Sequence, residues 1–593
     1  MQNSLRWKSS LNAAVLLAAS LFLTGQALSP AERPSQPHAA GPQLWYMNHS
    51  YLANDDALAA SKKLVDHAAE LGYNGVMFWD SGFNFMSDEF WPWENEARLG
   101  ELMKYAAKKG LRTMATPSPY GYSNEALYAN PNWAESQRII GALFQVDPSG
   151  KHLIFKDSFP GLKNAGFEEG KSDWFDTGDA GTGISTNAHS GKNAAVIVNA
   201  SGNARLRQKF PLKPWRQYHL RAWVKTENFA GNAMIEVLDS ANYDLYRLGS
   251  TFHVSGTHDW TQVDLAFNSQ DTTQGILYLG VWGGSTGTIW FDDLTLEETS
   301  LVYVTRRSGT PLRVYDPSQP ETVFKEGTDF NAIADPRMSE RAAFHDSYHA
   351  SPVVTLPPHT HLKAGQIVAM DYYAAFPLPD TLGISMCMTE PAAWKWVVQN
   401  TQEIKKQMAP NTGILLGYDE IRQMNSCASC RAKNMDAGAL LAWSIKQLIQ
   451  LHRSVTPAAQ LYIYNDMIDP YHNAQKHYYS VEGDLTGGWN GVPPDVIVLN
   501  WNLGNLKKSL SWFAGQDPRW PVFHQQLIAG YYDNSGGGAA AAKEELDQAA
   551  GIPGILGLMY FSWSDNYSQL QSFADSAHAN WARYQVTLRQ TRP

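Results

Sequence analysis

The feature that most constrains the fold of this chain is an alternation of short apolar segments and helical patterns. Three apolar segments, each closed by Gly or polar residues, come first, at 44–48, 75–80 and 111–116, with helical patterns at 56–71 and 99–109. The alternation stops between Pro117 and Thr412 and then resumes. Five more apolar segments come after it at 414–420, 461–466, 495–501, 521–526 and 557–563, with helical patterns at 437–454, 503–513 and 540–549. Alternating strands and helices form parallel sheets, and eight such strands close naturally into a (β/α)8 barrel.

Polar and aromatic residues gather where these predicted strands end. A TIM barrel builds its active site at the C-terminal ends of its strands, so this pattern favours an α/β TIM barrel with a long insertion between strands 3 and 4. A doubly wound open sheet also collects polar residues at its strand ends and stays open as an alternative. The strand-end residues are Asn48, Asp80, Ser118, Asp419, Glu420, Asp466, Asn500, Trp501, His524, Gln525, Gln526, Trp563, Ser564 and Asp565.

The fourth segment ends in two adjacent carboxylates, Asp419 and Glu420. Two neighbouring acids are costly to bury, and like charges raise the pKa of one of them, so one group can hold a proton near neutral pH while the other stays ionised. The pair therefore predicts acid/base chemistry. The structural alternative is that Asp419 caps the next segment and Glu420 pairs with Arg422 or Arg431.

The insertion divides into an all-β part at 161–299 and a second β-rich part at 300–391. The all-β part begins with Asn164-Ala165-Gly166-Phe167-Glu168 and ends with Ile289-Trp290-Phe291-Asp292-Asp293-Leu294. This ordered series resembles the jelly-roll carbohydrate-binding modules related to families 4, 9 and 22. The resemblance implies a structural calcium near the two terminal segments, held by Glu168 and Asp293; the alternative is a pair of solvated turn carboxylates. Such jelly rolls bind sugar or act as spacers, and both roles stay open.

The barrel, with Gly417-Tyr418-Asp419-Glu420 at its fourth strand and Trp501 and Trp563 at later strand ends, resembles the chitinase-like clan. We expect a relative of glycoside hydrolase families 20 and 123. The resemblance implies that Glu420 is the general acid/base and that Asp419 orients the 2-acetamido group of the substrate, whose carbonyl oxygen is the nucleophile. No cofactor is implied for catalysis.

The residues at the end of the predicted seventh strand support the same mechanism. Ordinary retaining glycosidases place a second carboxyl group about 5 Å from the acid/base. The segment at 521–526 ends in His524, Gln525 and Gln526, without a carboxylate. Two alternatives stay open: Asp466 or Asp565 serves as nucleophile or base in an ordinary retaining or inverting glycosidase, or the barrel binds glycan without catalysis.

Aromatic content points to a saccharide ligand, because sugar C–H faces stack on rings, although many of the 21 Trp and 27 Tyr belong to the core. The net charge of −10 is spread along the chain and argues against nucleic acid, which needs a basic face. We therefore expect an oligo- or polysaccharide substrate. The residues expected to contact it are Tyr46, Trp79, Asp80, Tyr418, Asn465, Asp466, Asn500, Trp501, Trp563 and Asp565.

The N-terminus predicts export to a periplasm or to the outside. Residues 1–27 have the basic start, apolar core and small residues of a signal peptide, and 28–42 form a Pro-rich leader before the two barrel parts at 43–160 and 392–593. No later stretch is long and apolar enough to span a membrane. Of three cysteines, Cys427 and Cys430 form a CxxC, which we interpret as a disulfide because a lone pair lacks the second pair of a zinc site.

Overall fold

The computed structural model describes residues 41–84, 86–87, 93–156, 159–176, 179–248, 254–377, 383–531 and 537–590. The predicted signal peptide and nearly all of the leader lie outside these residues. No helix within the described ranges is long and apolar enough to cross a membrane.

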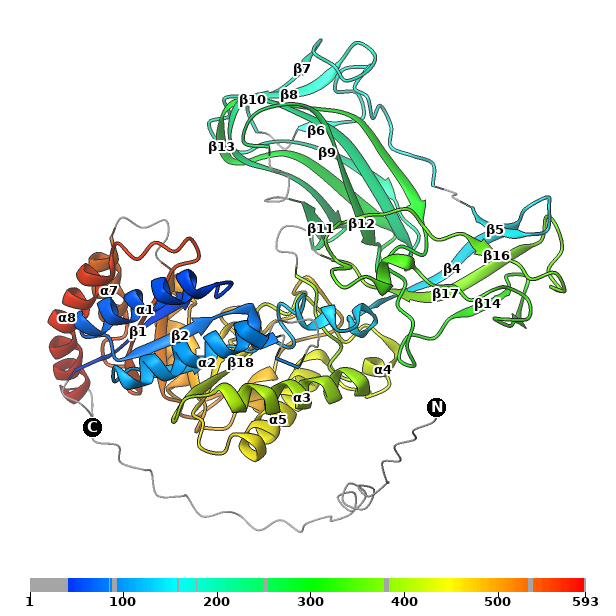
Figure 1. The fold of residues 1–593 in the computed structure, drawn as a ribbon. Helices are drawn as coiled ribbons and strands as arrows, with labels where there is room; N and C mark the ends of the chain where they lie inside the picture. Colours follow the sequence, from blue (N-terminus) through cyan, green and yellow to red (C-terminus); the bar gives the residue numbers. More distant parts are fainter. Residues whose placement is uncertain are drawn as a thin grey trace, which may run out of the picture. The chain divides into compact units, whose positions relative to one another are not determined.

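Eight parallel strands form a closed barrel, in the order β1-β2-β3-β18-β20-β22-β23-β24. Closure is made by β1, which pairs with both β2 and β24, and in Figure 1 the N-terminal elements (blue) accordingly lie beside the C-terminal ones (orange and red). The predicted closed barrel with an insertion between its third and fourth strands is confirmed, and the open sheet is excluded. The strands are β1 (Gln43–His49), β2 (Gly75–Trp79), β3 (Arg112–Ala115), β18 (Gly413–Leu416), β20 (Leu461–Tyr464), β22 (Ile497–Asn500), β23 (Gln526–Tyr531) and β24 (Ile555–Phe561).

The strands are apolar throughout because both of their faces are covered. In β1, Trp45 and Met47 join the cluster that fills the barrel interior, while Leu44 and Tyr46 join the layer between the strands and the outer helices. Alternate side chains of a strand point to opposite faces, so a continuous apolar run supplies both layers.

The helices at all five predicted positions are present, as α1, α2, α5, α6 and α7, and α3, α4 and α8 are additional. Between β20 and β22, where every residue is described, the chain forms no α-helix, only the 3-10 helices η6 (Asp466–Ile468) and η7 (Gly488–Gly491) and the short strand β21 (Ser480–Val481). The fifth repeat therefore leaves an irregular loop over the end of β20. The helices are α1 (Asp55–Glu70), α2 (Trp93–Lys108), α3 (Pro391–Gln407), α4 (Ala428–Arg431), α5 (Ala437–Val455), α6 (Leu506–Phe513), α7 (Gly538–Gln548) and α8 (Leu570–Gln590).

The seventh strand begins later than predicted, at Gln526 rather than Pro521. His524 and Gln526 are buried where the chain enters the strand, and not at the end that faces the site. The absence of a carboxylate there says nothing about a nucleophile. The residues that come after Tyr531, at 532–536, lie outside the described part of the chain.

The all-β part of the insertion is an eight-stranded antiparallel domain built on two long strands, β10 and β13, which pair along most of their length. The predicted opening strand is instead a turn: Asn164 and Phe167 have φ of 42° and 56°, and the Asn164 amide donates to the Gly170 and Ser172 carbonyls. Residues 189–192 likewise form a loop. The strands are β6 (Phe175–Asp176), β7 (Thr182–Ser185), β8 (Ala194–Val198), β9 (Ala204–Pro211), β10 (Gln217–Asp239), β11 (Asp244–Leu248), β12 (Gly256–Asn268) and β13 (Gln274–Thr299).

The second β-rich part is a six-stranded sheet in the order β15-β14-β17-β4-β5-β16. Its strands β4 and β5 precede the jelly roll in the chain and fall within the segment 43–160 predicted for the barrel. Antiparallel pairing of β4 with β17, from Gln137 opposite Ala374, moves that boundary to about residue 136. The strands are β4 (Gln137–Val146), β5 (His152–Phe155), β14 (Arg313–Asp316), β15 (Gln319–Phe324), β16 (Val354–Thr355) and β17 (Ile367–Ala374).

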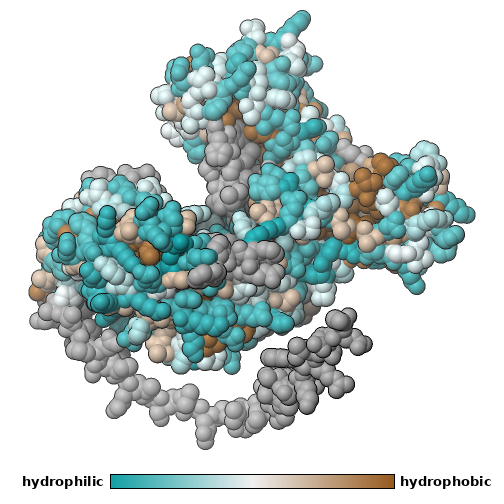
Figure 2. Space-filling model, in the orientation of Figure 1, coloured by the Kyte–Doolittle hydropathy of each residue, from teal (hydrophilic) through white to brown (hydrophobic). Residues whose placement is uncertain are grey.

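Hydrophilic residues cover most of the face shown in Figure 2, and apolar residues gather over the six-stranded sheet. The exposed large apolar side chains of that sheet are Ile140, Ile154, Val323 and Ile367. A further short pair, β19 (Gln423–Met424) with β21 (Ser480–Val481), fixes the loop after β18.

Candidate active site

A cavity of about 570 Å³ opens at the C-terminal ends of the barrel strands. Its volume lies in the range of small-molecule sites, roughly 300–1,000 Å³. Predicted site residues Trp79, Asp80, Asp419, Glu420, Trp501 and Trp563 line it, in agreement with the strand-end pattern. The other lining residues are His49, Ser50, Tyr51, Ser81, Asn84, Thr116, Ser118, Tyr122, Glu125, Tyr464, Ala529 and Phe561.

Contacts to the backbone and to both carboxylate oxygens fix the position of Glu420. Its φ is 41°, in the left-handed region that non-glycine residues rarely adopt, and its N–H donates to Asp466 Oδ2 at 2.8 Å. Arg422 Nη2 lies 3.1 Å from Oε1, and the Tyr122 hydroxyl donates to Oε2. Strained backbone conformations persist where the surroundings enforce them, and they cluster at functional sites.

Asp419 and Asp466 form a buried acidic layer beneath Glu420. Burial raises the pKa of Asp419 well above its ordinary value, and the charges of Asp466 and Glu420 raise it further. Burial also raises the pKa of Asp466 to about 7. Oδ1 of Asp419 is buried and has no hydrogen-bond partner among the described residues. Asp419 is thus the member of the predicted Asp419–Glu420 pair whose pKa is raised, and the raised pKa values of Asp419 and Asp466 favour a proton on these two buried groups near neutral pH.

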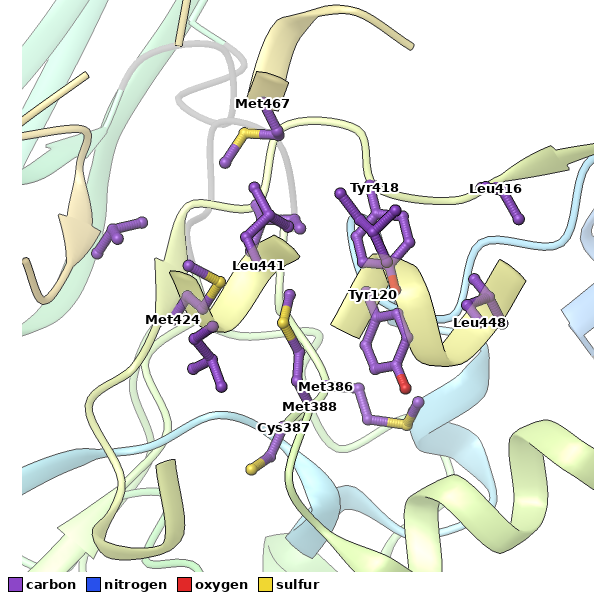
Figure 3. Close-up of a cluster of buried hydrophobic side chains, with 14 of the residues drawn as sticks. Tyr120, Met386, Cys387, Met388, Leu416, Tyr418, Met424, Leu441, Leu448 and Met467 are labelled. Carbon is purple, nitrogen blue, oxygen red and sulfur yellow. The ribbon is translucent and has the colours of Figure 1, made fainter. Parts of the chain in front are cut away.

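Two glycines allow the segment after β3 to reach the carboxylates. A Cβ on Gly121 would overlap the Asp419 backbone, and a Cβ on Gly417 would overlap Pro117 and Ser118. This close approach places Tyr122 on Glu420. Next to it, the Tyr120 ring stacks on Tyr418 at 5.3 Å, and Figure 3 shows both rings in a cluster of buried apolar side chains.

Aromatic rings form one wall of the cavity. Trp563 meets Trp79 edge to face at 5.0 Å and keeps 43% of its surface exposed. Trp501 packs against His472 at 4.3 Å. Next to this wall, Asp80 accepts hydrogen bonds from the Gly82 N–H (2.7 Å) and the Ser50 hydroxyl (3.1 Å), and burial raises its pKa to about 6.

Six residues predicted to contact substrate do not line the cavity: Tyr46, Tyr418, Asn465, Asp466, Asn500 and Asp565. Tyr418 donates or accepts at the Ser444 hydroxyl behind the barrel wall, and Tyr46 is buried in the outer layer. Asn500 bonds the Gln526 amide, again inside the fold. Asp565 is exposed near the rim, 3.6 Å from His49. Side chains alternate between faces, so half of the strand-end residues point away from the site.

Asn465 and Asp466 act behind the lining. The Asn465 side-chain amide accepts a hydrogen bond from the backbone N–H of Trp501 at 3.0 Å and donates one to Asp469 at 2.7 Å, so it positions the backbone of the tryptophan. Asp466 binds the Glu420 N–H and accepts from the Asn473 amide at 3.2 Å. Both residues support the site without lining the cavity.

Tyr122 and Glu125 line the cavity but are not predicted by the sequence. They come after β3 at the start of the long insertion, where no periodic pattern marks them, and the nearest signal is Tyr120-Gly121-Tyr122 itself. Burial raises the pKa of Glu125 above its ordinary value. Arg422 does pair with Glu420, as the structural alternative predicts, whereas Arg431 lies 3.8 Å from Glu482.

The predicted calcium ligands Glu168 and Asp293 both bind the loop at 189–193. Glu168 accepts from the Lys192 and Asn193 N–H groups at 2.8 and 3.1 Å, and Asp293 accepts from the Ser190 hydroxyl at 2.9 Å. The group of metal-binding side chains found within the described residues does not include them. Calcium in the jelly roll stays a prediction.

The three cysteines are free, so the predicted disulfide between Cys427 and Cys430 is not formed. Both lie beside a third thiol, Cys387, with Sγ–Sγ distances of 3.5 and 3.6 Å, against about 2.05 Å in a disulfide. The CxxC spacing by itself gives no sign of the distant third cysteine that joins it.

Comparison with known proteins identifies one part of the chain. A family model of the CBM_4_9 group, described as BppA domain 1, matches residues 165–296. This confirms that the all-β part resembles carbohydrate-binding modules. No curated protein matches the chain, and the relationship of the barrel to glycoside hydrolase families 20 and 123 stays a prediction.

Solved structures similar to about a quarter of the chain include carbohydrate-binding modules, a bacteriophage tailspike protein and adhesin domains of Lys-gingipain. TmCBM61 in complex with beta-1,4-galactotriose is 20% identical over 23% of this chain and 97% of that one, with a TM-score of 0.19. A family 4 module is 17% identical over 23% and 99%, with a TM-score of 0.19. The CBM22-1 xylan-binding domain of Paenibacillus barcinonensis Xyn10C is 14% identical over 23% and 91%, with a TM-score of 0.20.

Proposed function

We propose that this protein is an exported glycoside hydrolase whose acid/base is Glu420. The observation that carries the proposal is the adjacent Asp419 and Glu420 in an aromatic-walled cavity at the strand ends of the barrel. A carbohydrate-binding-module domain in the same chain supports a saccharide substrate and glycan binding. Such modules are typical of extracellular proteins, in keeping with the predicted signal peptide.

The site has the proton that acid catalysis requires. The carboxyl groups of Asp419, Glu420 and Asp466 lie close together, because the charges of Asp466 and Glu420 both raise the pKa of Asp419, and Arg422 pairs with Glu420. Like charges in a buried site cannot all ionise. At least one proton therefore stays in the site near neutral pH. Glu420 lines the cavity, and the Tyr122 hydroxyl and Arg422 fix its two oxygens, so its protonated form would be oriented to give a proton to the leaving oxygen.

Asp419 supports the substrate-assisted form of the reaction on a 2-acetamido sugar. Its Oδ1 is buried without a partner, and its side chain lines the cavity, where a substrate amide N–H would satisfy it. The acetamido oxygen would bond to the anomeric carbon while the bond to the leaving oxygen breaks and Glu420 protonates that oxygen. Water would then open the oxazolinium and return its proton to Glu420.

The charges of the side chains that line the cavity indicate which class of sugar the site accepts. Asp80, Glu125, Asp419 and Glu420 line the cavity, and the described lining residues include no Lys or Arg. An anionic sugar would find no cationic side chain among these lining residues, so neutral and 2-acetamido sugars are favoured over uronic acids.

The alternative nucleophiles are less well placed. Asp466 is fully buried behind the Glu420 backbone, and Asp565 lies exposed at the rim. Asp533 comes after β23 in the sequence and lies outside the described residues. An ordinary retaining enzyme would use a carboxyl group from that strand end, so Asp533→Asn belongs in the test.

Hydrolysis of aryl β-glycosides tests the proposal, with N-acetylglucosaminides and N-acetylgalactosaminides set against their 2-hydroxy counterparts. Release from acetamido sugars only, lost in Glu420→Gln and Asp419→Asn and kept in Asp533→Asn, supports substrate assistance. Release from 2-hydroxy sugars that is lost in Asp533→Asn points to an ordinary retaining enzyme. Undiminished activity of Glu420→Gln would show that the assignment of the acid/base is wrong.

A further inference from the structure

A second cluster of reactive side chains lies away from the cavity. Cys387, Cys427, Cys430 and Glu135 are all buried, and one ligand atom from each lies within 4.8 Å of the other three. These are the only cysteines of the chain. We propose that they form a structural zinc site with three thiolates and one carboxylate oxygen.

The spacing of the ligand atoms fits a single tetrahedral ion. Bond lengths of about 2.3 Å to sulfur and about 2.0 Å to oxygen place tetrahedral sulfurs about 3.8 Å apart and an oxygen about 3.5 Å from each sulfur. The Cys387 sulfur lies 3.5 Å from that of Cys427 and 3.6 Å from that of Cys430. Glu135 Oε2 lies 3.5 Å from the Cys430 sulfur. An iron–sulfur cluster would need its ligands farther apart.

The donor types select zinc. Thiolates favour zinc over calcium and magnesium, which take oxygen ligands, and four ligands with no open position are typical of structural sites. Glu135 presents one oxygen to the sulfurs because its other oxygen, Oε1, accepts from the Ser426 and Cys427 N–H groups at 2.7 and 2.8 Å.

Surrounding groups are those that support a thiolate site. The Thr389 hydroxyl lies 3.2 Å from the Cys430 sulfur, and the Ser429 hydroxyl lies 3.2 Å from the Cys427 sulfur. The buried guanidinium of Arg307 interacts with the charges of Cys387, Cys427 and Glu135 and would offset part of the negative charge that four anionic ligands leave on Zn²⁺. Outer groups of this kind orient ligands and tune a metal site.

The location gives the site a structural role. Glu135 precedes β4, where the chain leaves the barrel, and Cys387 precedes α3, where it returns. Cys427 and Cys430 belong to the loop that comes after Glu420 and carries Arg422. One ion would tie both ends of the long insertion to the catalytic loop, and closing long loops is where a cross-link stabilises most. Figure 3 shows Cys387 at the edge of the buried cluster under this loop.

The purified full-length mature protein tests the proposal by metal content, independently of any glycosidase activity. We expect one zinc per chain by inductively coupled plasma mass spectrometry, released by a mercurial reagent, and three thiols that react with Ellman's reagent only after unfolding with a chelator. Thr226→Ser, a buried change in β10 of the jelly roll, is the matched control and should keep the zinc.

Cobalt substitution keeps the proposal testable where Cys387→Ser, Cys430→Ser or Glu135→Gln fails to fold. The cobalt form should show sulfur-to-cobalt charge-transfer bands and intense tetrahedral d–d bands, which in this chain only these cysteines can supply. A mass two hydrogens below the reduced chain, or three thiols without metal, would overturn the site. A full equivalent of another ion would overturn the assignment to zinc.

Discussion

The backbone N–H of Glu420 donates a 2.8 Å hydrogen bond to the carboxylate of Asp466, from the next strand of the barrel. Glu420 holds a left-handed conformation, and this bond is one of the contacts that enforce it. A buried acid of the fifth strand thus orients the acid/base of the fourth. A substitution of either residue should therefore alter the conformation or the charge state of the other.

Asp466→Asn should stabilise the protein most at neutral pH. The folded state raises the pKa of Asp466 from 3.8 to about 7, so between these values folded protein holds a proton that unfolded chain has released. The contribution of Asp466 to the free energy of unfolding is therefore complete below about pH 4. It decreases by at most about 4 kcal/mol as the pH rises to about 7. In Asp466→Asn, the side-chain amide oxygen can still accept the hydrogen bond from the Glu420 N–H. Because the amide carries no charge, the variant does not lose stability as the pH rises.

Melting temperature from pH 4 to pH 8, monitored by tryptophan fluorescence, measures this effect. The difference between variant and wild type should grow as pH rises. Asp517→Asn is the control, because the hydrogen bond from Arg519 lowers the pKa of Asp517 and its effect falls at acid pH instead. A difference that is constant from pH 4 to pH 8 would refute the raised pKa.

Tyr122→Phe should lower kcat/KM about 10- to 100-fold while the protein stays folded. The hydroxyl donates to Glu420, and a hydrogen bond to a charged group contributes about 1.5–3 kcal/mol. Tyr105→Phe removes a hydroxyl that binds Asp66 on the outer helices and is the matched control. Equal activity of the two variants would mean that Tyr122 does not act on the acid/base.

Gly121→Ala should abolish most activity while the rest of the barrel stays folded. The added Cβ overlaps the Asp419 carbonyl oxygen, a backbone atom that no side-chain rotation relieves, so the segment carrying Tyr122 must move. Gly504→Ala, where a Cβ meets no atom within 4 Å, is the control. Steady-state kinetics and circular dichroism of both variants give the comparison, and full activity of Gly121→Ala would contradict the close approach.

The barrel is predictable from the sequence because its strands are apolar on both faces and end in polar residues, so strand count and order can be inferred from local pattern. The seventh strand is misplaced by the run Pro521-Val522-Phe523, which is apolar but precedes the ladder that begins at Gln526. Strand ends locate the site but not the direction of each side chain, which is why the pattern wrongly assigns Tyr418 and Asn500 to the cavity.

Contacts between distant segments are beyond the reach of local pattern. Tyr122 meets Glu420 across a separation of 298 residues, and Cys387 meets Cys430 across 43. No periodicity or spacing encodes either pair, because the insertion boundaries that bring them together depend on the closed barrel. The CxxC is visible in the sequence, whereas its two remaining partners are not.

Trp563→Ala should raise KM about tenfold with a smaller effect on kcat. Trp563 packs edge to face against Trp79 and exposes 43% of its surface, and it lines the cavity, so its ring can stack on a sugar ring. Because the ring binds ground state and transition state alike, its loss acts on KM. Trp563→Phe keeps a ring and should recover most of the affinity, and Trp260→Ala in the jelly roll should leave the KM for a small aryl glycoside unchanged. If kcat fell instead and Trp563→Phe gave no recovery, Trp563 would position the reacting groups rather than form a sugar-binding wall.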